Sequence, residues 1–411
     1  MVKDKSSKIF YGYIVVAASL LILVIMHGIH STYGVFFGSL QKEFRANRAT
    51  ISGPHSLAFI LEGLFAIAMG KLTDKFGPRI LITICGIIFG LGYYLMSQVN
   101  SLWQLYLFYP IIVGMGVSGG NVSLQTTTAR WFVKRRGLMT SIVKVGTGTG
   151  MFIMPLVATW LISDYSWRNA YLVLSIIGVI GIVIMAQFLR REPEQMGLQP
   201  YGMYNANSTI SESTPVIHLS PQEVIRTRQF WVVCVAYFVV WYTTQSVMIH
   251  IVAHAMDSGI AATQAASIIS TVGAISILGR LSIGTISDRL GGRWALIICF
   301  MVLIIALSWL QFVDRLWMLY LFGVIYGFAH GGFFSVLSPL VAELFGTMSH
   351  GMNLGMVYSL GQIGGAIGPV ITGRIFDISH SYQLAFLILL VAGVGALILS
   401  ITQIKPVNRV V

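Results

Sequence analysis

Apolar residues are arranged along the chain in long runs, and short polar turns separate most of these runs. Twelve of them are each near the roughly 20 residues that a helix needs to cross a bilayer. They are predicted at about 11–38, 51–70, 80–98, 103–129, 137–161, 168–189, 230–254, 263–286, 295–313, 317–341, 353–373 and 382–403. The first run lacks a small-residue cleavage site and is expected to be a retained membrane helix. The pattern predicts an all-α polytopic membrane protein with twelve transmembrane helices.

The polar stretch 190–228 divides these runs into two groups of six. Residues 205–215 within it are mainly Asn, Ser, Thr and Glu, a composition that cannot build a core and indicates a linker. We therefore expect an N-terminal six-helix bundle over 1–189, a cytoplasmic linker over 190–228 and a C-terminal six-helix bundle over 229–411.

Composition supports a membrane protein and limits what else the chain can do. Of the 411 residues, 56% are hydrophobic and 10% are charged, whereas a soluble domain carries about a quarter charged residues. The three cysteines all lie inside apolar runs without metal-ligand spacing, so we interpret them as packing residues. No cofactor and no metal is expected.

The basic residues predict the orientation in the membrane. If the N-terminus is inside, 18 of the 26 Lys and Arg residues fall on the cytoplasmic side and 6 on the external side. The remaining two, Lys144 and Arg280, lie in the membrane. This asymmetry predicts a multi-pass protein of the cell (inner) membrane with both termini in the cytoplasm. It also accounts for the net charge of +12 without a nucleic-acid partner.

The two halves repeat one charged, glycine-containing turn at an offset of 214 residues, which is the separation of Gly70 and Gly284. The first copy contains Gly70, Asp74, Lys75, Gly77 and Arg79, and the second contains Gly284, Asp288, Arg289, Gly291 and Arg293. Glycine permits tight backbone geometry, and an aspartate there can accept hydrogen bonds from arginines or helix N-termini. Two turns in register predict paired structural elements that act in conformational change.

These turns resemble the signature motif of the major facilitator superfamily. Within it the chain is similar to the monocarboxylate transporter and oxalate/formate exchanger branch, on the segments Tyr11–Tyr13, Gly34–Phe37, Arg130–Gly137, Ser220–Trp231 and Arg280–Gly284. The resemblance implies two pseudo-symmetric bundles that rock about a midplane site, which is the major facilitator fold. We find no Walker-type phosphate loop. The glycine run 146–150 is interpreted as a helix-packing face.

Arg280 is the leading candidate for binding substrate. It lies about eight residues, roughly 12 Å, from the turn at Asp288, and its guanidinium does not lose its charge. We expect an anionic substrate to compensate it, and the alternative is a structural ion pair, for which Glu62 is available. In the family, the matching arginine binds the substrate carboxylate. An aspartate common one turn earlier is Ser276 here, and neutral Gln362 lies in the region of the exchanger's lysine, which favours a monovalent anion.

Lys144 and Glu62 are the other charged side chains within the spans. Lys144 is interpreted either as a second substrate contact, as a lysine that titrates, or as a side chain that snorkels to the interface without a role. Glu62 is a candidate proton carrier. The alternatives are a static ion pair with Lys144 or Arg280, and a side chain that faces the bundle interior without a role in turnover.

Histidines form two pairs at helical spacing, His27 with His30 and His250 with His254. His250 is the candidate for proton coupling and for substrate contact, because it resembles a pocket histidine of this branch. Ordinary helix contacts and, less favoured, a zinc site are the alternatives. Further candidates for substrate binding are Asn121, Tyr326, His330, Tyr358 and Gln362.

The predicted function is secondary active transport of a small organic anion, a monocarboxylate such as lactate or pyruvate, by alternating access with proton symport. The alternatives are organic anion exchange, with a counter-anion as the partner, and export of amphipathic compounds. An enzyme is not expected, because no convergent acid–base or metal motif is present. The transporter is expected to function as a monomer in the lipid bilayer.

Overall fold

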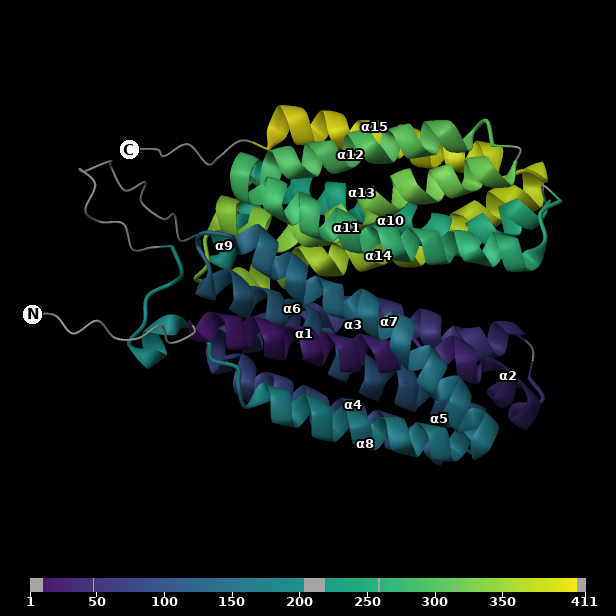
Figure 1. Ribbon diagram of the computed structural model, residues 1–411, viewed down its shortest axis with the longest axis horizontal. Helices are drawn as coiled ribbons and strands as arrows, with labels where there is room; N and C mark the ends of the chain where they lie inside the picture. Colours follow the sequence, from purple (N-terminus) through teal and green to yellow (C-terminus); the bar gives the residue numbers. More distant parts are fainter. Residues whose placement is uncertain (1–9, 47, 203–218, 258, 314, 405–411) are drawn as a thin grey trace, which may run out of the picture.

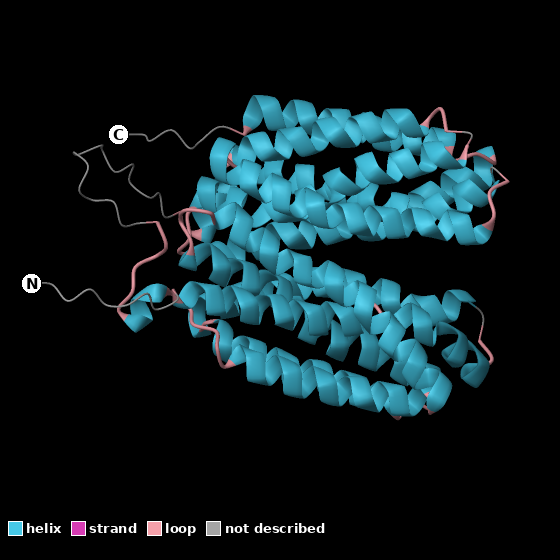
Figure 2. Ribbon diagram, viewed as in Figure 1, coloured by secondary structure: helices cyan, strands magenta, loops and turns pink. Residues whose placement is uncertain are grey.

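The computed structural model describes residues 10–46, 48–202, 219–257, 259–313 and 315–404. Almost all of this chain is helical (Figure 2). Within these described residues, twelve helical segments are long and apolar enough to cross a membrane, which confirms the predicted number of spans. The first span consists of two helices, α1 (Tyr11–His30) and α2 (Tyr33–Phe44). The third span is α4 (Pro78–Ser97), and the fifth is α7 (Arg136–Asp164). The second and sixth are α3 (Arg48–Phe76) and α8 (Trp167–Ala186).

The fourth span is built from three pieces, α5 (Leu102–Leu107), a π-helical segment (Phe108–Val113) and α6 (Gly114–Trp131). The π-helical segment contains Pro110, which has no amide hydrogen to donate along a regular helix. The C-terminal spans are α10 (Arg228–Asp257), α11 (Ala262–Leu290), α12 (Gly292–Leu310), α13 (Leu316–Phe345), α14 (His350–Ser379) and α15 (Gln383–Gln403).

The helices form two bundles, with α1–α8 in one and α10–α15 in the other (Figure 1). One hydrophobic core belongs to α1–α8, and a second is formed almost entirely by the C-terminal helices. We call the end that carries residues 10, 202, 219 and 404 the linker end, and the opposite end, where α2 and α5 lie, the far end. The bundles approach each other most closely at the linker end and diverge toward the far end (Figure 1).

Two aspartates of the repeated turns join the bundles at the linker end. Asp74 of α3 accepts hydrogen bonds from the backbone amides of Gly351 and Met352 at the start of α14. Asp288 of α11 accepts from the amides of Gly137 and Leu138 at the start of α7. Each carboxylate thus occupies the N-terminus of a helix from the opposite bundle, where exposed amides and the helix dipole favour negative charge.

Glycines allow the backbones to approach at both contacts. A Cβ atom added to Gly70 would lie 2.1 Å from the carbonyl oxygen of Gly351, and one added to Gly137 would lie 2.3 Å from that of Gly284. Neither distance is possible between real atoms, so a residue larger than glycine requires the helices to separate. We call these two contacts, made by Asp74 with Gly70 and Gly351 and by Asp288 with Gly137 and Gly284, the two clasps.

The described parts of the segment between the bundles are pinned to the linker end. Residues Pro193–Met196 form a 3₁₀-helix, and α9 (Pro221–Arg226) begins with Ser220 and Glu223 in a capping box. Tyr201 pairs with the turn after α6, since its amide donates to the Trp131 carbonyl and its carbonyl accepts from Val133 and Lys134. Residues 205–215 lie outside the described residues, and the boundaries at 189 and 229 stay a prediction.

Candidate functional site

A chain of four buried polar side chains crosses from one bundle to the other. The Lys144 ammonium on α7 donates to the side-chain oxygen of Asn121 on α6 at 2.7 Å. The Asn121 amide donates to the Tyr358 hydroxyl on α14 at 2.9 Å. Arg280 on α11 donates from Nη1 to the main-chain oxygen of Lys144 at 3.3 Å. Four of the predicted residues are therefore brought together, and we call Asn121, Lys144, Arg280 and Tyr358 the central cluster.

Within the part of the chain that the structure describes, no carboxylate forms an ion pair with Lys144 or Arg280 of the central cluster. Among the described residues, ion-pair distances join His30 to Glu62, Arg130 to Asp74 and Arg168 to Glu43. Arg280 is 5% exposed and its Nε atom has no hydrogen-bond partner. A desolvated guanidinium in this state strongly favours an added anion.

The glycine run of α7 makes room for this arginine. A Cβ at Gly148 would lie 2.7 Å from Arg280 Nη1, while Gly146 and Gly150 are pressed against the backbone of α1 at Leu20 and Val24. The predicted packing role of this run is confirmed, with an addition. Its middle glycine faces the candidate site instead of another backbone.

An aromatic side chain that the sequence does not predict, Trp241, packs against the central cluster at Tyr358. Trp241 of α10 makes edge contacts with Tyr358, with Phe334 of α13 and, across the bundles, with Phe59 of α3. The Lys144 ammonium lies 6.0 Å from the Tyr358 ring centre. The buried indole nitrogen of Trp241 has no partner, so it is a further donor available to a ligand. Sequence offered only one signal for it, a tryptophan in the middle of a span.

Two histidines lie near the central cluster. His330 of α13 was a candidate, and the charge of Arg280 acts on its ring. His27 of α1, which sequence alone does not single out for substrate binding, interacts with Lys144, Asn121 and Arg280. The buried Nδ1 atom of His330 lacks a partner. Tyr326, one turn before His330, makes only a long contact of 3.5 Å from its hydroxyl to the Thr244 carbonyl.

Gln362 and His250 occupy different surroundings. Gln362 is one turn from Tyr358 on α14, packs against Gly63 of α3, and has a buried side-chain oxygen without a partner. His250 lies between α14 and the start of α15, where Nδ1 is 3.2 Å from the Tyr382 hydroxyl and Nε2 is 3.0 Å from the Pro369 carbonyl. The structure thus does not bring His250 into the central cluster, and both of its ring nitrogens are satisfied.

Glu62 has a partner other than those expected. Its Oε1 lies 3.0 Å from His30 Nε2, and no ion pair joins it to Lys144 or Arg280 among the described residues. The idea of a static pair with either cation is therefore wrong for this conformation. The reason is that Glu62 of α3 lies against His30 of α1, a contact between two helices that spacing along the sequence does not reveal.

The remaining motif residues shape the linker end. Gly77 and Gly291 have positive φ angles of 80° and 87° and directly precede α4 and α12. Arg79 donates to the Gln187 side chain and Arg293 to the Ile401 carbonyl. Lys75 lies over the Phe76 ring, and Arg289 is exposed.

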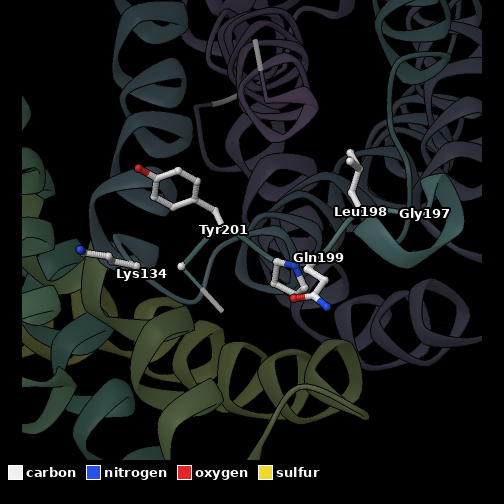
Figure 3. Close-up of a pocket in the computed structure, with 7 residues that line it drawn as sticks. Lys134, Gly197, Leu198, Gln199 and Tyr201 are labelled. Atoms are coloured by element: carbon white, nitrogen blue, oxygen red, sulfur yellow. The ribbon is translucent and has the colours of Figure 1, made fainter. Parts of the chain in front are cut away.

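One surface hollow lies at the linker end, away from the central cluster. Figure 3 shows it at the linker end, lined by Lys134, Gly197, Leu198, Gln199, Pro200, Tyr201 and Gly202. It adjoins residues that the structure does not describe, so we assign it no role.

Twelve spans in two bundles, with buried polar residues between them, define a membrane transporter. The Major Facilitator Superfamily profile matches residues 19–288 and 233–410, and the chain belongs to this family. Human monocarboxylate transporter 12 is 24% identical over 400 residues, which cover 92% of this chain and 77% of the relative. Rat monocarboxylate transporter 13 is 25% identical over 393 residues, covering 94% and 88%. The branch suggested by the sequence motifs is the one these relatives belong to.

Solved structures show the same fold. The Escherichia coli fucose:proton symporter FucP superposes with a TM-score of 0.73 at 14% identity, covering 95% of this chain and 98% of that one. The human organic anion transporter MFSD10 gives 0.72 at 15% identity, covering 95% and 99%. These likenesses confirm the major facilitator architecture predicted from the repeated turns.

Proposed function

We propose that this transporter carries a small organic anion, a monocarboxylate of the lactate or pyruvate kind, by alternating access with proton symport. One observation carries the proposal: the buried Arg280 guanidinium has no carboxylate partner among the described residues. A substrate carboxylate would fit the donor fork and remove the cost of an unpaired buried charge. Names of the matched relatives point to the same class of substrate.

In this proposal the central cluster forms the binding site. Arg280 binds the carboxylate, and Lys144, Asn121 and Tyr358 complete its hydrogen bonds, with His330, Tyr326, Gln362 and His250 as further candidates. Because the cluster draws on both bundles, a bound anion changes the contacts between them. The clasps hold the linker end closed, so we propose that Asp74, Asp288 and their motif residues set which side the site faces.

A second candidate function is exchange of organic anions. The observation that favours it is the position of Lys144 beside Arg280, which gives the site two cations. Two cations suit a dianion or an anion with a second acidic group. Export of amphipathic cations is disfavoured, since the central cluster itself is cationic.

We further propose that the protein resides in the cell membrane with both termini in the cytoplasm, and that it functions as a monomer. The 18-to-6 distribution of basic residues supports the orientation. In this orientation the structure faces outward, since the clasps close its linker end.

Uptake into proteoliposomes tests the function. Labelled lactate, pyruvate, formate, oxalate and malonate would be offered under an imposed pH gradient, and separately with unlabelled anion inside the vesicles. Saturable monocarboxylate uptake driven by the pH gradient is the expected result. Uptake that requires an internal anion and ignores the pH gradient would favour exchange, and no uptake of any anion would contradict the proposal.

A further inference from the structure

A second group of polar side chains lies in the N-terminal bundle, between the middle of α3, where Glu62 is, and the far end. It comprises His30 of α1, His55 and Glu62 of α3, and Tyr109 of the π-helical segment. The His30 and Glu62 side chains are 12% and 6% exposed, and their closest polar atoms are 3.0 Å apart. Among the described residues, neither His30 Nε2 nor Glu62 Oε1 has a hydrogen bond of good geometry, so both buried atoms lack a hydrogen-bond partner.

Among the described groups near Glu62, His30 is the one that can carry a positive charge opposite its carboxylate. From the packed elements, His30 of α1, Tyr93 of α4, Tyr109 and Tyr358 of α14 face it. Gln362 of α14 lies beside the adjacent Gly63. The charges of Lys144 and Arg280 act on His27, one turn before His30, and neither pairs with Glu62.

Such a pair changes its net charge by binding one proton. With Glu62 ionised and His30 neutral the pair carries one negative charge, and with one more proton it carries none. Burying net charge is costly, and histidine is the side chain whose ordinary titration falls near neutral pH. A buried carboxyl and an imidazole at this separation have the composition needed to share one added proton.

A line of polar groups connects this pair to the far end. His55 is two helical turns before Glu62, roughly 10 Å along α3 toward the far end, and is half-buried. Its ring centre lies 5.8 Å from that of His30, and its Nδ1 is 3.4 Å from the Tyr109 hydroxyl. Tyr109 stacks on His30 at 5.7 Å and donates to the His30 carbonyl. Tyr33 of α2 also stacks on His55, with ring centres 5.2 Å apart.

We propose that His30 and Glu62 form the proton-binding site of this transporter and that His55 loads it from the far end. A proton taken up by the His55 ring crosses to His30, a gap that one water molecule can span. It comes to rest on His30 Nε2 or Glu62 Oε1, so only N–H and O–H bonds form and break. This inference rests on the proton-coupled form of the proposed function and deepens it.

The proton site adjoins the interface between the bundles. A Cβ at Gly63, next to Glu62, would lie 2.8 Å from the Gln362 side chain of α14. The charge of Glu62 acts on Tyr358, which is hydrogen-bonded to Asn121 and through it to Lys144. Neutralising Glu62 therefore alters the field at the α3–α14 contact and at the central cluster. That is the physical link needed for coupling proton to anion.

The competing explanation is that His30 and Glu62 simply tie α1 to α3. Proton binding by the purified full-length protein separates the two, because infrared difference spectroscopy across pH detects protonation of a buried carboxyl without any substrate. We expect a buried carboxyl signal that Glu62→Gln removes and that His30→Gln shifts in pH. Glu43→Gln, which alters an exposed carboxylate paired with Arg168, is the matched control and should leave the signal in place. A signal unaffected by Glu62→Gln overturns the proposal.

Transport in proteoliposomes supplies the second test, with the anion found in the panel above. Under a gradient of one pH unit, one-to-one symport accumulates substrate about tenfold. Glu62→Gln and His30→Gln should lose this accumulation while still exchanging labelled for unlabelled substrate, and His55→Gln should slow the pH-driven phase. Glu62→Asp, which keeps a carboxylate, should retain part of the accumulation.

Failure of this inference is distinguishable from failure of the proposed function. Wild-type accumulation in Glu62→Gln, or loss of both accumulation and exchange in the correctly folded protein, overturns the proton site. Absence of anion transport by the wild type overturns the proposed function instead, and the spectroscopic titration then still decides whether the pair binds a proton.

Discussion

The Nη1 atom of Arg280 donates a 3.3 Å hydrogen bond to the main-chain oxygen of Lys144, which places the two cations of the membrane interior at one crossing of α11 and α7. Each comes from a different bundle, and each is 5% exposed. Like charges held close in a low-dielectric region repel, and an anion between them relieves that repulsion. Substrate binding and the approach of the two bundles are therefore predicted to be coupled at this crossing.

Replacing Arg280 by lysine should abolish saturable anion uptake. Lysine keeps the charge but lacks the planar fork that binds a carboxylate through two parallel hydrogen bonds. The measurement is initial uptake rate against substrate concentration in proteoliposomes, with thermal unfolding of the purified variant as a check on folding. Arg374→Lys, an exposed arginine near the end of α14, is the matched control. Kinetics like those of the wild type in Arg280→Lys would show that the arginine does not bind substrate.

Replacing Lys144 by glutamine should weaken substrate binding without abolishing it. Losing one charged member of a buried hydrogen-bonded pair costs about 2 kcal/mol or more, which corresponds to roughly a 30-fold rise in KM. The rise should be larger for malonate or oxalate than for lactate if the lysine binds a second acidic group. Equal changes for all anions would assign Lys144 a positioning role through Asn121.

Sequence reasoning located most of the central cluster because charge inside an apolar run is rare. Arg280 and Lys144 are conspicuous for that reason, and the repeated turns predicted the carboxylates that accept from helix N-termini. Their pairing could not be predicted, because it depends on where α7 and α11 cross. Gly148, which permits that crossing, looks in sequence like its neighbours Gly146 and Gly150.

The partner of Glu62 shows the same limit. Sequence offered Lys144 and Arg280 as counter-charges because opposite formal charges attract, whereas in three dimensions Glu62 lies against His30 of α1. His30 lies on another helix, and His55 drew no attention because it lies near the start of a span. Trp241 was overlooked since an aromatic residue in a membrane helix is common and its unpaired indole nitrogen is visible only in three dimensions.

Adding one methyl group at Gly70 should open the linker end. Its Cβ would lie 2.1 Å from the Gly351 carbonyl oxygen, so Gly70→Ala forces α3 and α14 apart. We expect a smaller population of the closed form, measured as a longer distance between spin labels on the ends of these two helices, and slower transport. Gly395→Ala is the matched control, because nothing lies within 4 Å of a Cβ there. Unchanged label distances in Gly70→Ala would contradict a role of the close contact.

The two clasps should differ in strength, since their carboxylates have different partners. Asp74 accepts from two backbone amides and also from Arg130 at 2.6 Å, whereas Asp288 accepts from two backbone amides alone. Arg130 lies in the same bundle as Asp74 and donates across to the carbonyls of Thr347 and Met348, so Asp74 also holds in place a second set of contacts between the bundles. Hydrogen bonds to a charged group contribute about 1.5–3 kcal/mol, so Asp74→Asn, which weakens both sets, should shift the equilibrium toward an open linker end further than Asp288→Asn. Spin-label distances across both contacts, recorded without substrate, measure each shift. The double variant should open both contacts, since they join separate helix pairs. A larger effect of Asp288→Asn would show that Arg130 compensates for the loss of the Asp74 charge and that the clasp at α7 and α11 dominates.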